Sequence, residues 1–418
     1  MTLAGGALRV DPPRVVAALR ELHERTGDER GAQRLAWGET WRTARRWLYE
    51  QISPLPVEIT EDAAGNRWAT LHGERPEAVV IGSHIDSVPN GGWLDGSLGL
   101  LAGLEVLRAL ADRGTPPVTI RLVDWADEEG ARFGYGCLGS SAAARTVDLA
   151  ELDDLTDRDG RRLPDVLADN GVDVARMLDA AGELRDAAAY LELHIEQGPV
   201  LEALGLPLGV VVGTSGVERH TITFSGQAAH AGSTPMDARR DPLAAAARLV
   251  LAVREPAYEA GAVATVGSCV TDPGIPTAVP ARCRITLDQR DRDAGVLARL
   301  LERARADAAA IAADEGVSVK WEKLWGIEPV DFDPQLIALA DEAVRAVAGD
   351  GHQLPSGPLH DAAEVARAGV PTVMLFTQSL RGLSHTPEED TRPEHLELAV
   401  RALAGTVERT LDWVSASS

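Results

Sequence analysis

Two apolar stretches of this chain end in residues that could bind metal. One ends at His84, and Asp95 follows it in a glycine-rich turn; the other runs into the neighbouring pair Glu128 and Glu129. Strand ends that deliver histidine, aspartate and glutamate into loops build metal sites for hydrolysis, and an ionised carboxylate can bridge two cations. A neighbouring carboxylate that is not a ligand can take a proton from water. The pattern therefore indicates metal-assisted hydrolysis.

Two further histidines could join these residues. His194 lies in a third strand-like stretch, and His385 lies in a Gly-Leu-Ser-His loop. Asp86, two residues after His84, is placed to orient the ring of that histidine. Taken singly, each residue has an ordinary interpretation, because strand-end histidines are commonly structural and an aspartate before glycine commonly forms a turn. The residues alone leave both interpretations open, since their spacings are long and match no short zinc signature such as His-Glu-x-x-His.

Composition limits the class of protein and its partners. The chain has 418 residues, enough for two domains, and its 41 basic and 64 acidic side chains give a net charge of −23. Such acidity argues against nucleic acid or an anionic membrane as the main partner. The three cysteines, Cys137, Cys269 and Cys283, form no disulfide framework. The N-terminus has no secretory signal and no stretch approaches the roughly 20 apolar residues of a membrane helix, so we expect a cytoplasmic protein.

Helical and strand-like stretches alternate from about residue 10 to residue 208. Helices are expected at 12–25, 33–51 and 97–112, and strands at 79–83, 118–125 and 190–195. This alternation predicts an α/β domain with a mostly parallel sheet. In such domains ligands bind at the carboxyl ends of the strands, where the candidate residues lie.

Residues 209–323 follow a different pattern. Strands are expected at 209–214, 219–225, 262–270, 282–288 and 316–321, and helices at 242–254 and 293–314. This series fits a small antiparallel sheet with two helices on one face. The α/β pattern then resumes, with a helix opened by Asp333, a strand at 372–376 and a closing helix at 393–414. We therefore expect a discontinuous catalytic domain, 1–208 and 324–418, with a smaller α+β dimerisation or lid domain inserted at 209–323.

Longer segments of the chain resemble a known group of enzymes. The segments are Gly82–Gly96, Glu128–Phe133, Leu191–Pro199, Gly226–Met236 and Gly382–His385. They are similar, and in the same order, to segments of the hydantoinase/carbamoylase amidases, which include N-carbamoyl-L-amino-acid hydrolases, allantoate amidohydrolases and β-ureidopropionases. This group belongs to the superfamily of dinuclear-metal aminoacylases and peptidases, and the resemblance spans nearly the whole chain.

The resemblance implies a role for individual residues. Two divalent ions, foremost zinc with manganese, cobalt and nickel as alternatives, would be held by His84, Asp95, Glu129, His194 and His385. His84 and His194 would hold one ion, Glu129 and His385 the other, and Asp95 would bridge them. Glu128 would be the general base, Gln197 would touch the substrate and His230 would polarise the scissile carbonyl. Arg290 would bind the substrate carboxylate, which a guanidinium fork suits.

Three departures from the family pattern affect the expected substrate pocket. Thr277 stands where the family has a substrate-contacting asparagine, so a hydroxyl replaces the donor and acceptor of an amide. Pro358 and Leu359 stand where the family has alanine and glycine, and Ser141 replaces a basic residue. The metal ligands are intact, whereas the pocket is expected to be narrower and more apolar.

The resemblance implies a metal-dependent amidohydrolase that cleaves a linear C–N amide bond of a small carboxylate-bearing substrate, foremost an N-carbamoyl-L-amino acid or related ureido acid. Two alternatives stay open: an N-acyl-amino-acid amidase or dipeptidase of the same superfamily, and a non-catalytic ligand-binding descendant. The expected assembly is a homodimer formed through 209–323, with the inserted domain closing on the catalytic domain.

Overall fold

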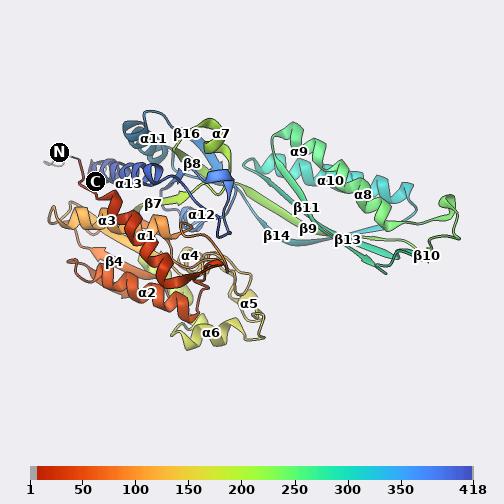
Figure 1. Ribbon diagram of the computed structural model, residues 1–418, viewed down its shortest axis with the longest axis horizontal. Coiled ribbons are helices and arrows are strands. Elements are labelled where there is room, and N and C mark those ends of the chain that lie inside the picture. The colour runs from red at the N-terminus through yellow and green to blue at the C-terminus, as the bar shows by residue number, and fades with distance from the viewer. Residues whose placement is uncertain (1–6, 417–418) are drawn as a thin grey trace. The chain divides into compact units, whose positions relative to one another are not determined.

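The chain folds into two compact units (Figure 1). A computed structural model describes residues 7–416. One unit contains the chain up to Gly213 and again from Asp331, and the other spans Thr214–Val330. The first is a mixed α/β unit built on a large sheet and the second is a smaller α+β unit. This arrangement confirms the expected fold class.

The large sheet of the first unit has a parallel centre. Its four central strands stand in the order β17 (Thr372–Thr377), β7 (Ala187–Ile195), β5 (Ala78–His84) and β6 (Thr119–Trp125). These neighbours pair in parallel. The flanking strands β8 (Leu208–Thr214), β4 (Arg67–Leu71) and β3 (Glu58–Glu61) are antiparallel to their neighbours. The central strands are almost wholly buried, because helices cover such a sheet and exclude water from it.

Helix α3 (Ser97–Ala111) packs against three of the central strands, β5, β6 and β7. It is apolar around most of its circumference and buried along nearly its whole length, as expected of a helix enclosed by other elements. Helices α1 (Pro12–Thr26) and α13 (Pro393–Ala416) pack on α3 in turn. The start of α3 is thereby fixed beside the carboxyl end of β5.

Helix α2 (Glu39–Ile52) corrects one prediction. The expected helix spanned 33–51, but residues 33–38 are not helical and the helix begins after Gly38. The segment before it pairs instead with a loop: the Ala32 N–H donates to Gly91 O at 2.8 Å, and the Ser87 N–H donates to Arg34 O at 3.1 Å. Tertiary hydrogen bonds outweigh the local helical pattern there.

The second unit is a four-stranded antiparallel sheet covered on one side by helices (Figure 1). The strand order is β11 (Val263–Asp272), β13 (Arg282–Asp291), β9 (Gly216–Ser225) and β14 (Ser318–Ile327). Helices α8 (Pro242–Ala252), α9 (Arg254–Ala260) and α10 (Ala294–Asp314) pack on its apolar face. Asp241 caps α8 through the N–H groups of Leu243 and Ala244, and Pro242 is the first helical residue.

Strand β8 belongs to the large sheet, which corrects the prediction for this stretch. The glycine- and valine-rich stretch 209–214 was expected in the inserted domain, but β8 pairs with β17 in the large sheet. Both faces of β8 are buried there, which suits its small and branched side chains. At the other end, β14 continues to Ile327 beside β9. The second unit therefore runs from 214 to 330, whereas 209–323 was expected.

Among residues 7–416, no helix is long and apolar enough to span a membrane.

Candidate metal centre

Four neighbouring parallel strands deliver the predicted ligands to one edge of the large sheet. β5 ends at His84, β7 ends just after His194, the loop after β6 carries Glu129, and the loop after β17 carries His385. Asp95 lies two residues before the start of α3. Gly96, which stands between them, has a positive φ of 62°. Because the carboxyl ends of parallel strands share one edge, residues as far apart in the chain as His84 and His385 meet there.

Asp95 joins two groups of potential ligands. Its Oδ1 lies 3.8 Å from His84 Nε2 and 3.2 Å from His194 Nε2. Its Oδ2 lies 3.4 Å from His385 Nε2, which is 3.3 Å from Glu129 Oε2. In each group the ligand atoms all lie within 4.8 Å of one another. Three imidazoles and two carboxylates with one shared carboxylate suit a pair of divalent cations, so the donor set fits the predicted metals.

The two buried histidines are oriented by their other ring nitrogen. Nδ1 of His84 lies 3.2 Å from the carbonyl oxygen of Asp86, and Nδ1 of His194 lies 3.0 Å from that of Ile195. Such contacts fix Nδ1 as the protonated nitrogen and leave Nε2 with its lone pair. Nε2 of His84 is buried without a hydrogen-bond partner among the described residues. A cation would satisfy this nitrogen.

Asp86 also positions the acidic pair. Its carboxylate oxygens accept the backbone N–H groups of Glu128 at 3.3 Å and Glu129 at 3.2 Å. Asp86 Oδ1 lies 3.6 Å from His84 Nδ1. One buried carboxylate thus fixes the end of β5 relative to the loop after β6.

Glu128 lies beside both groups but belongs to neither. Its Oε2 is 3.6 Å from His84 Nε2. Burial raises the pKa of Glu128 well above its usual value, whereas the charge of His84 opposes that rise. Burial also raises the pKa of Glu129, with the charge of Asp95 adding to the effect. For Asp95 burial acts in the same direction, but the hydrogen bond and charge of His194 outweigh it, so the pKa of Asp95 is lowered.

Gln197 lies at the same edge, in a left-handed conformation with φ 57°. Its amide nitrogen donates to Asp95 Oδ2 at 2.9 Å and lies 3.1 Å from Ser384 Oγ. Its carbonyl oxygen is buried without a partner among the described residues. Ser384 in turn contacts Asp95 Oδ2 and Glu389 Oε2, both at 2.9 Å.

His230, Thr277 and Arg290 lie in the second unit. His230 is exposed in the short strand β10 (Ala229–His230), which pairs with β12 (Ala278–Val279), and the carbonyl of Thr277 accepts the Ala231 N–H at 2.9 Å. Arg290 lies at the opposite end of β13, where its Nε donates to Asp288 Oδ1 at 2.8 Å. At about 3.3 Å per residue, the strand from Arg282 to Arg290 spans roughly 25 Å. Within one copy of this unit, Arg290 is therefore far from His230 and Thr277.

Sequence reasoning missed His360. It lies directly before α12 (Asp361–Arg367), with its ring centre 4.5 Å from that of His194 and its Nδ1 3.9 Å from Glu128 Oε1. Neither ring nitrogen has a hydrogen-bond partner among the described residues, although the side chain is buried. Burial lowers the pKa of His360 well below its usual value, and the neighbouring His194 adds to this effect. The available signal is the His360-Asp361 pair, which directly follows Pro358 and Leu359, the two residues that depart from the family pattern.

The departures at 141 and 358–359 also lie in the first unit. Ser141 is buried in α4 (Leu138–Ala144), and its hydroxyl donates to Leu138 O at 3.1 Å. Leu359 is partly exposed and directly precedes the buried His360. The substitution at 359 therefore adds a side chain next to the ring that faces Glu128.

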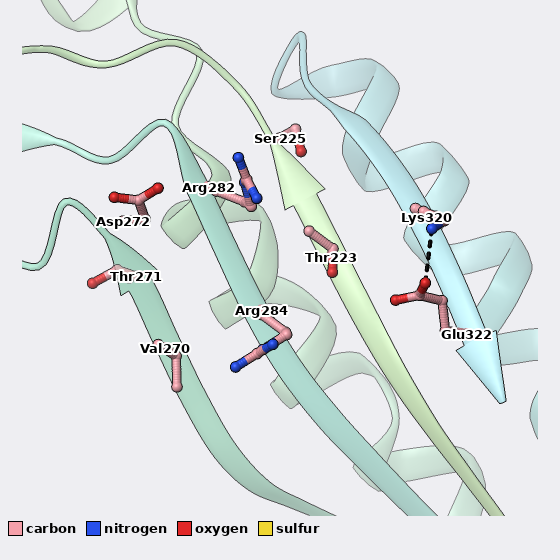
Figure 2. Close-up of a pocket in the computed structure, with 9 residues that line it drawn as sticks. All are labelled: Thr223, Ser225, Val270, Thr271, Asp272, Arg282, Arg284, Lys320 and Glu322. Atoms are coloured by element: carbon pink, nitrogen blue, oxygen red, sulfur yellow. Dashed lines mark hydrogen bonds and ion pairs between the residues drawn. The ribbon is translucent and has the colours of Figure 1, made fainter. Parts of the chain in front are cut away.

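One open cavity of the protein does not coincide with these residues (Figure 2). It is an open hollow of about 490 Å³ on the uncovered face of the sheet in the second unit. It is lined by Thr223, Ser225, Val270, Thr271, Asp272, Arg282, Arg284, Lys320 and Glu322. Lys320 is paired with Glu322 at 2.7 Å, and none of the predicted site residues contributes to the lining. This hollow is therefore separate from the groups of potential metal ligands.

Comparison with known proteins agrees with this geometry. The profile of peptidase family M20/M25/M40 matches residues 80–409. The N-carbamoyl-L-amino acid amidohydrolase of Geobacillus stearothermophilus is 37% identical over 383 residues, which are 90% of this chain and 93% of that protein. The allantoate amidohydrolase of Bacillus subtilis is 32% identical over 89% of this chain and 91% of its own.

A solved structure agrees as well. An amidase of the hydantoinase/carbamoylase family from Burkholderia multivorans superposes with a TM-score of 0.87, at 34% identity, over 96% of this chain and 98% of that one. The predicted family and reaction class are thereby confirmed. The chain belongs to peptidase family M20/M25/M40 and, within it, to the metal-dependent amidohydrolases of the hydantoinase/carbamoylase group, which act on linear C–N amide bonds.

Proposed function

We propose that this protein hydrolyses N-carbamoyl-L-amino acids or related ureido acids at the residues around Asp95. The proposal depends on the position of the Asp95 carboxylate between two groups of potential ligands. One of its oxygens faces His84 and His194, and the other faces His385 beside Glu129. Divalent ions held there would polarise the scissile carbonyl and lower the pKa of the attacking water.

Glu128 is proposed as the general base. It is buried, it lies beside the ligands, and its raised pKa suits a group that takes a proton and then returns it. Its carboxylate would accept the proton of the attacking water and deliver it to the leaving nitrogen. Gln197 is held against Asp95, and its carbonyl oxygen, which has no partner among residues 7–416, would accept a hydrogen bond from the substrate.

Two divalent ions per chain are proposed, with zinc foremost. Imidazole and carboxylate together suit zinc, although manganese, cobalt and nickel accept the same ligands. Metal analysis of protein purified without added metal should find about two divalent ions per chain. Chelation should abolish turnover, and addition of each metal in turn should identify the one that restores it best. Full turnover by a metal-free sample would refute the proposal.

The acidic end of the substrate is assigned to Arg290 and its carbonyl to His230. Arg290 carries a guanidinium whose Nε donates to Asp288 Oδ1, and His230 is exposed. Because roughly 25 Å of strand separates these residues within one copy, a single small substrate cannot touch both unless two copies contribute. We therefore propose a homodimer in which each substrate meets Arg290 of one copy and His230 of the other.

The second unit offers a surface for such pairing. Strand β11 is an edge of its sheet, and edge strands readily pair with a second copy. Large apolar side chains are exposed on α8, α9 and β11, namely Leu251, Tyr258, Val263 and Val270. Exposed apolar side chains on an open edge strand, such as Val263 and Val270 on β11, support pairing at that edge. Light scattering coupled to gel filtration should give twice the mass of one chain.

Among the possible substrates, those with an apolar side chain are proposed to be favoured. Thr277 lacks the amide that the family places there, and a substrate group left unpaired costs on the order of 1–3 kcal/mol. Leu359 adds apolar bulk beside His360. Allantoate, which is polar throughout, should therefore be a weak substrate, and N-carbamoyl-leucine or N-carbamoyl-methionine a better one.

A panel of kcat/KM values tests this assignment. Carbamoyl amino acids, allantoate, N-acyl amino acids and dipeptides would be compared, since an acylase or dipeptidase would prefer the last two and a non-catalytic binder would turn over none. Thr277→Asn should recover part of the activity on polar substrates. Arg290→Ala should raise KM for acids but not for a matched neutral amide. A preference of the wild type for allantoate would contradict the proposed pocket and leave the reaction class intact.

We also propose a cytoplasmic location. All three cysteines are free thiols, which suits a reducing compartment.

A further inference from the structure

Arg34 is a fully buried arginine beneath the candidate metal centre. It lies between β2 (Gly31–Ala32) and α2, and none of its surface is exposed. Its Nε donates to the carbonyl of Ile85 at 2.7 Å, and its Nη2 donates to Ser97 Oγ at 2.8 Å. Its Nη1 is buried with no hydrogen-bond partner among residues 7–416.

The two groups that Arg34 contacts mark the ends of one loop. Ile85 directly follows His84 at the end of β5, and Ser97 begins α3. The loop between them carries Asp86 and Asp95. The backbone adds two bonds to the same loop, because the Arg34 N–H donates to Ser87 Oγ at 3.0 Å and the Ser87 N–H donates to Arg34 O at 3.1 Å. The guanidinium of Arg34 therefore connects the two ends of the loop that carries Asp95.

The charge of Arg34 has no single partner. No carboxylate lies within ion-pair distance of its guanidinium in the described part of the chain, yet four acidic side chains act on it electrostatically. In decreasing order these are Asp86, Glu389, Asp95 and Glu129. Glu389 accepts the backbone N–H groups of Leu94 and Asp95, both at 3.0 Å, and burial raises the pKa of Glu389 to about 7.

Arg45 shows what a locally paired arginine looks like in the same unit. It is equally buried, but its Nε lies 2.7 Å from Asp124 Oδ2. A buried charge costs free energy unless it is compensated. For Arg45, the single carboxylate of Asp124 provides this compensation. Arg34 has no such single carboxylate among the described residues, and the acidic cluster compensates it jointly.

We infer that Arg34 is a positioning residue whose fixed positive charge offsets the mutual repulsion of Asp86, Asp95, Glu129 and Glu389, and that it thereby holds the metal site together before metal binds. This inference rests on the proposed metal centre. Without metal, Arg34 supplies these carboxylates with a positive charge that does not depend on the protonation of the neighbouring histidines. With two divalent ions in place, four further positive charges offset the same repulsion, so Arg34 contributes much less.

The test compares the melting temperature Tm of the full-length protein with and without metal. Arg34→Met removes the charge, and Arg34→Lys keeps it but cannot donate to both ends of the loop. Ser97→Ala removes one of the loop contacts and leaves the charge. Arg45→Met is the matched control, because it removes an equally buried guanidinium that has its own carboxylate.

Arg34→Met should lower the Tm of the chelated protein by roughly 5–10 °C and that of the metal-loaded protein by less than half as much. The gap between loaded and chelated Tm should therefore widen relative to the wild type. Arg34→Lys should keep a gap close to that of the wild type. Arg45→Met should lower the Tm of both forms equally.

Equal losses in both forms of Arg34→Met would overturn the charge role and leave Arg34 a simple loop clamp. An unchanged Tm would overturn both roles. If Arg34→Met cannot be produced, Arg34→Gln takes its place, because it removes the charge and keeps a polar side chain. A gap wider than that of Ser97→Ala would support the charge role, and equal losses in both forms of both variants would overturn it. A wild type whose Tm does not respond to any divalent metal would refute the metal centre itself, and this inference with it.

Discussion

At the scale of single residues, Glu128 and Glu129 are neighbours with different surroundings. Glu129 Oε2 faces His385 at 3.3 Å, whereas Glu128 lies outside both ligand groups. Glu128→Gln should therefore keep a near-normal metal content and lose at least ~10²-fold in kcat, the lower range for general acid–base catalysis. Glu129→Gln should lower metal content as well. Metal analysis and steady-state kinetics on both variants separate the two roles, and normal turnover of Glu128→Gln would exclude it as the base.

How far residue types reveal a site depends on their setting. His84, Glu129 and His194 could be predicted as candidates because each ends or follows an apolar stretch. His360 follows no such stretch, so the His360-Asp361 pair is its available local signal, and its ring reaches His194 only through tertiary folding. The burial of Arg34 could not be predicted for another reason. Within a pattern that indicates a helix, a charged residue is expected on the solvated face, and only the contact with Ile85 and Ser97 reveals its burial.

At the scale of elements, the close approach of α3 to the sheet sets the position of Asp95. Gly99 lies where a Cβ would come 2.1 Å from the carbonyl oxygen of Leu193 in β7. Gly103, one turn later, would meet Leu122 Cδ1 at 2.7 Å, which is the end of a flexible side chain. Gly99→Ala should therefore push α3 from β7 and cost about 1–3 kcal/mol or more in stability, whereas Gly103→Ala should cost less.

The same pair of variants also tests the link between helix position and ligands. Because Leu193 precedes His194, displacement of α3 in Gly99→Ala should separate Asp95 from His194 and weaken metal binding at least several-fold. Gly103→Ala lies further from the ligands and serves as the control. Thermal unfolding and a competition titration with a coloured chelator measure the two effects. Unchanged metal affinity in a destabilised Gly99→Ala would show that the loop, not the helix, positions Asp95.

Elements themselves could be predicted better than their partners. The strands at 79–83, 118–125 and 190–195 follow from apolar runs, and all three lie in the parallel centre of the sheet. The stretch 209–214 was recognised as a strand but placed in the wrong sheet, because its partner β17 begins more than 150 residues later. Strand pairing at such separation is decided by packing over both faces, which local composition does not contain.

At the scale of the whole molecule, the length of β13 keeps Arg290 and His230 of one copy too far apart to contact the same small substrate. Since Arg290 and His230 lie at opposite ends of one unit, a chain that lacks Arg290 and a chain that lacks His230 have complementary defects. Arg290→Ala and His230→Ala should each lose most of their turnover as pure homodimers. Mixed and allowed to exchange, they should form a heterodimer in which one site lacks both residues and the other site retains both.

Random exchange of an equimolar mixture makes half of the dimers mixed, each with one of two sites intact, so about a quarter of wild-type activity should return. Differently tagged chains would allow the heterodimer to be purified, and its activity should then approach half of that of the wild type. The control is a mixture of Arg290→Ala with the double variant, which can rebuild no site. If activity does not return in a heterodimer whose formation has been verified by tandem purification, Arg290 and His230 do not serve one substrate from two copies.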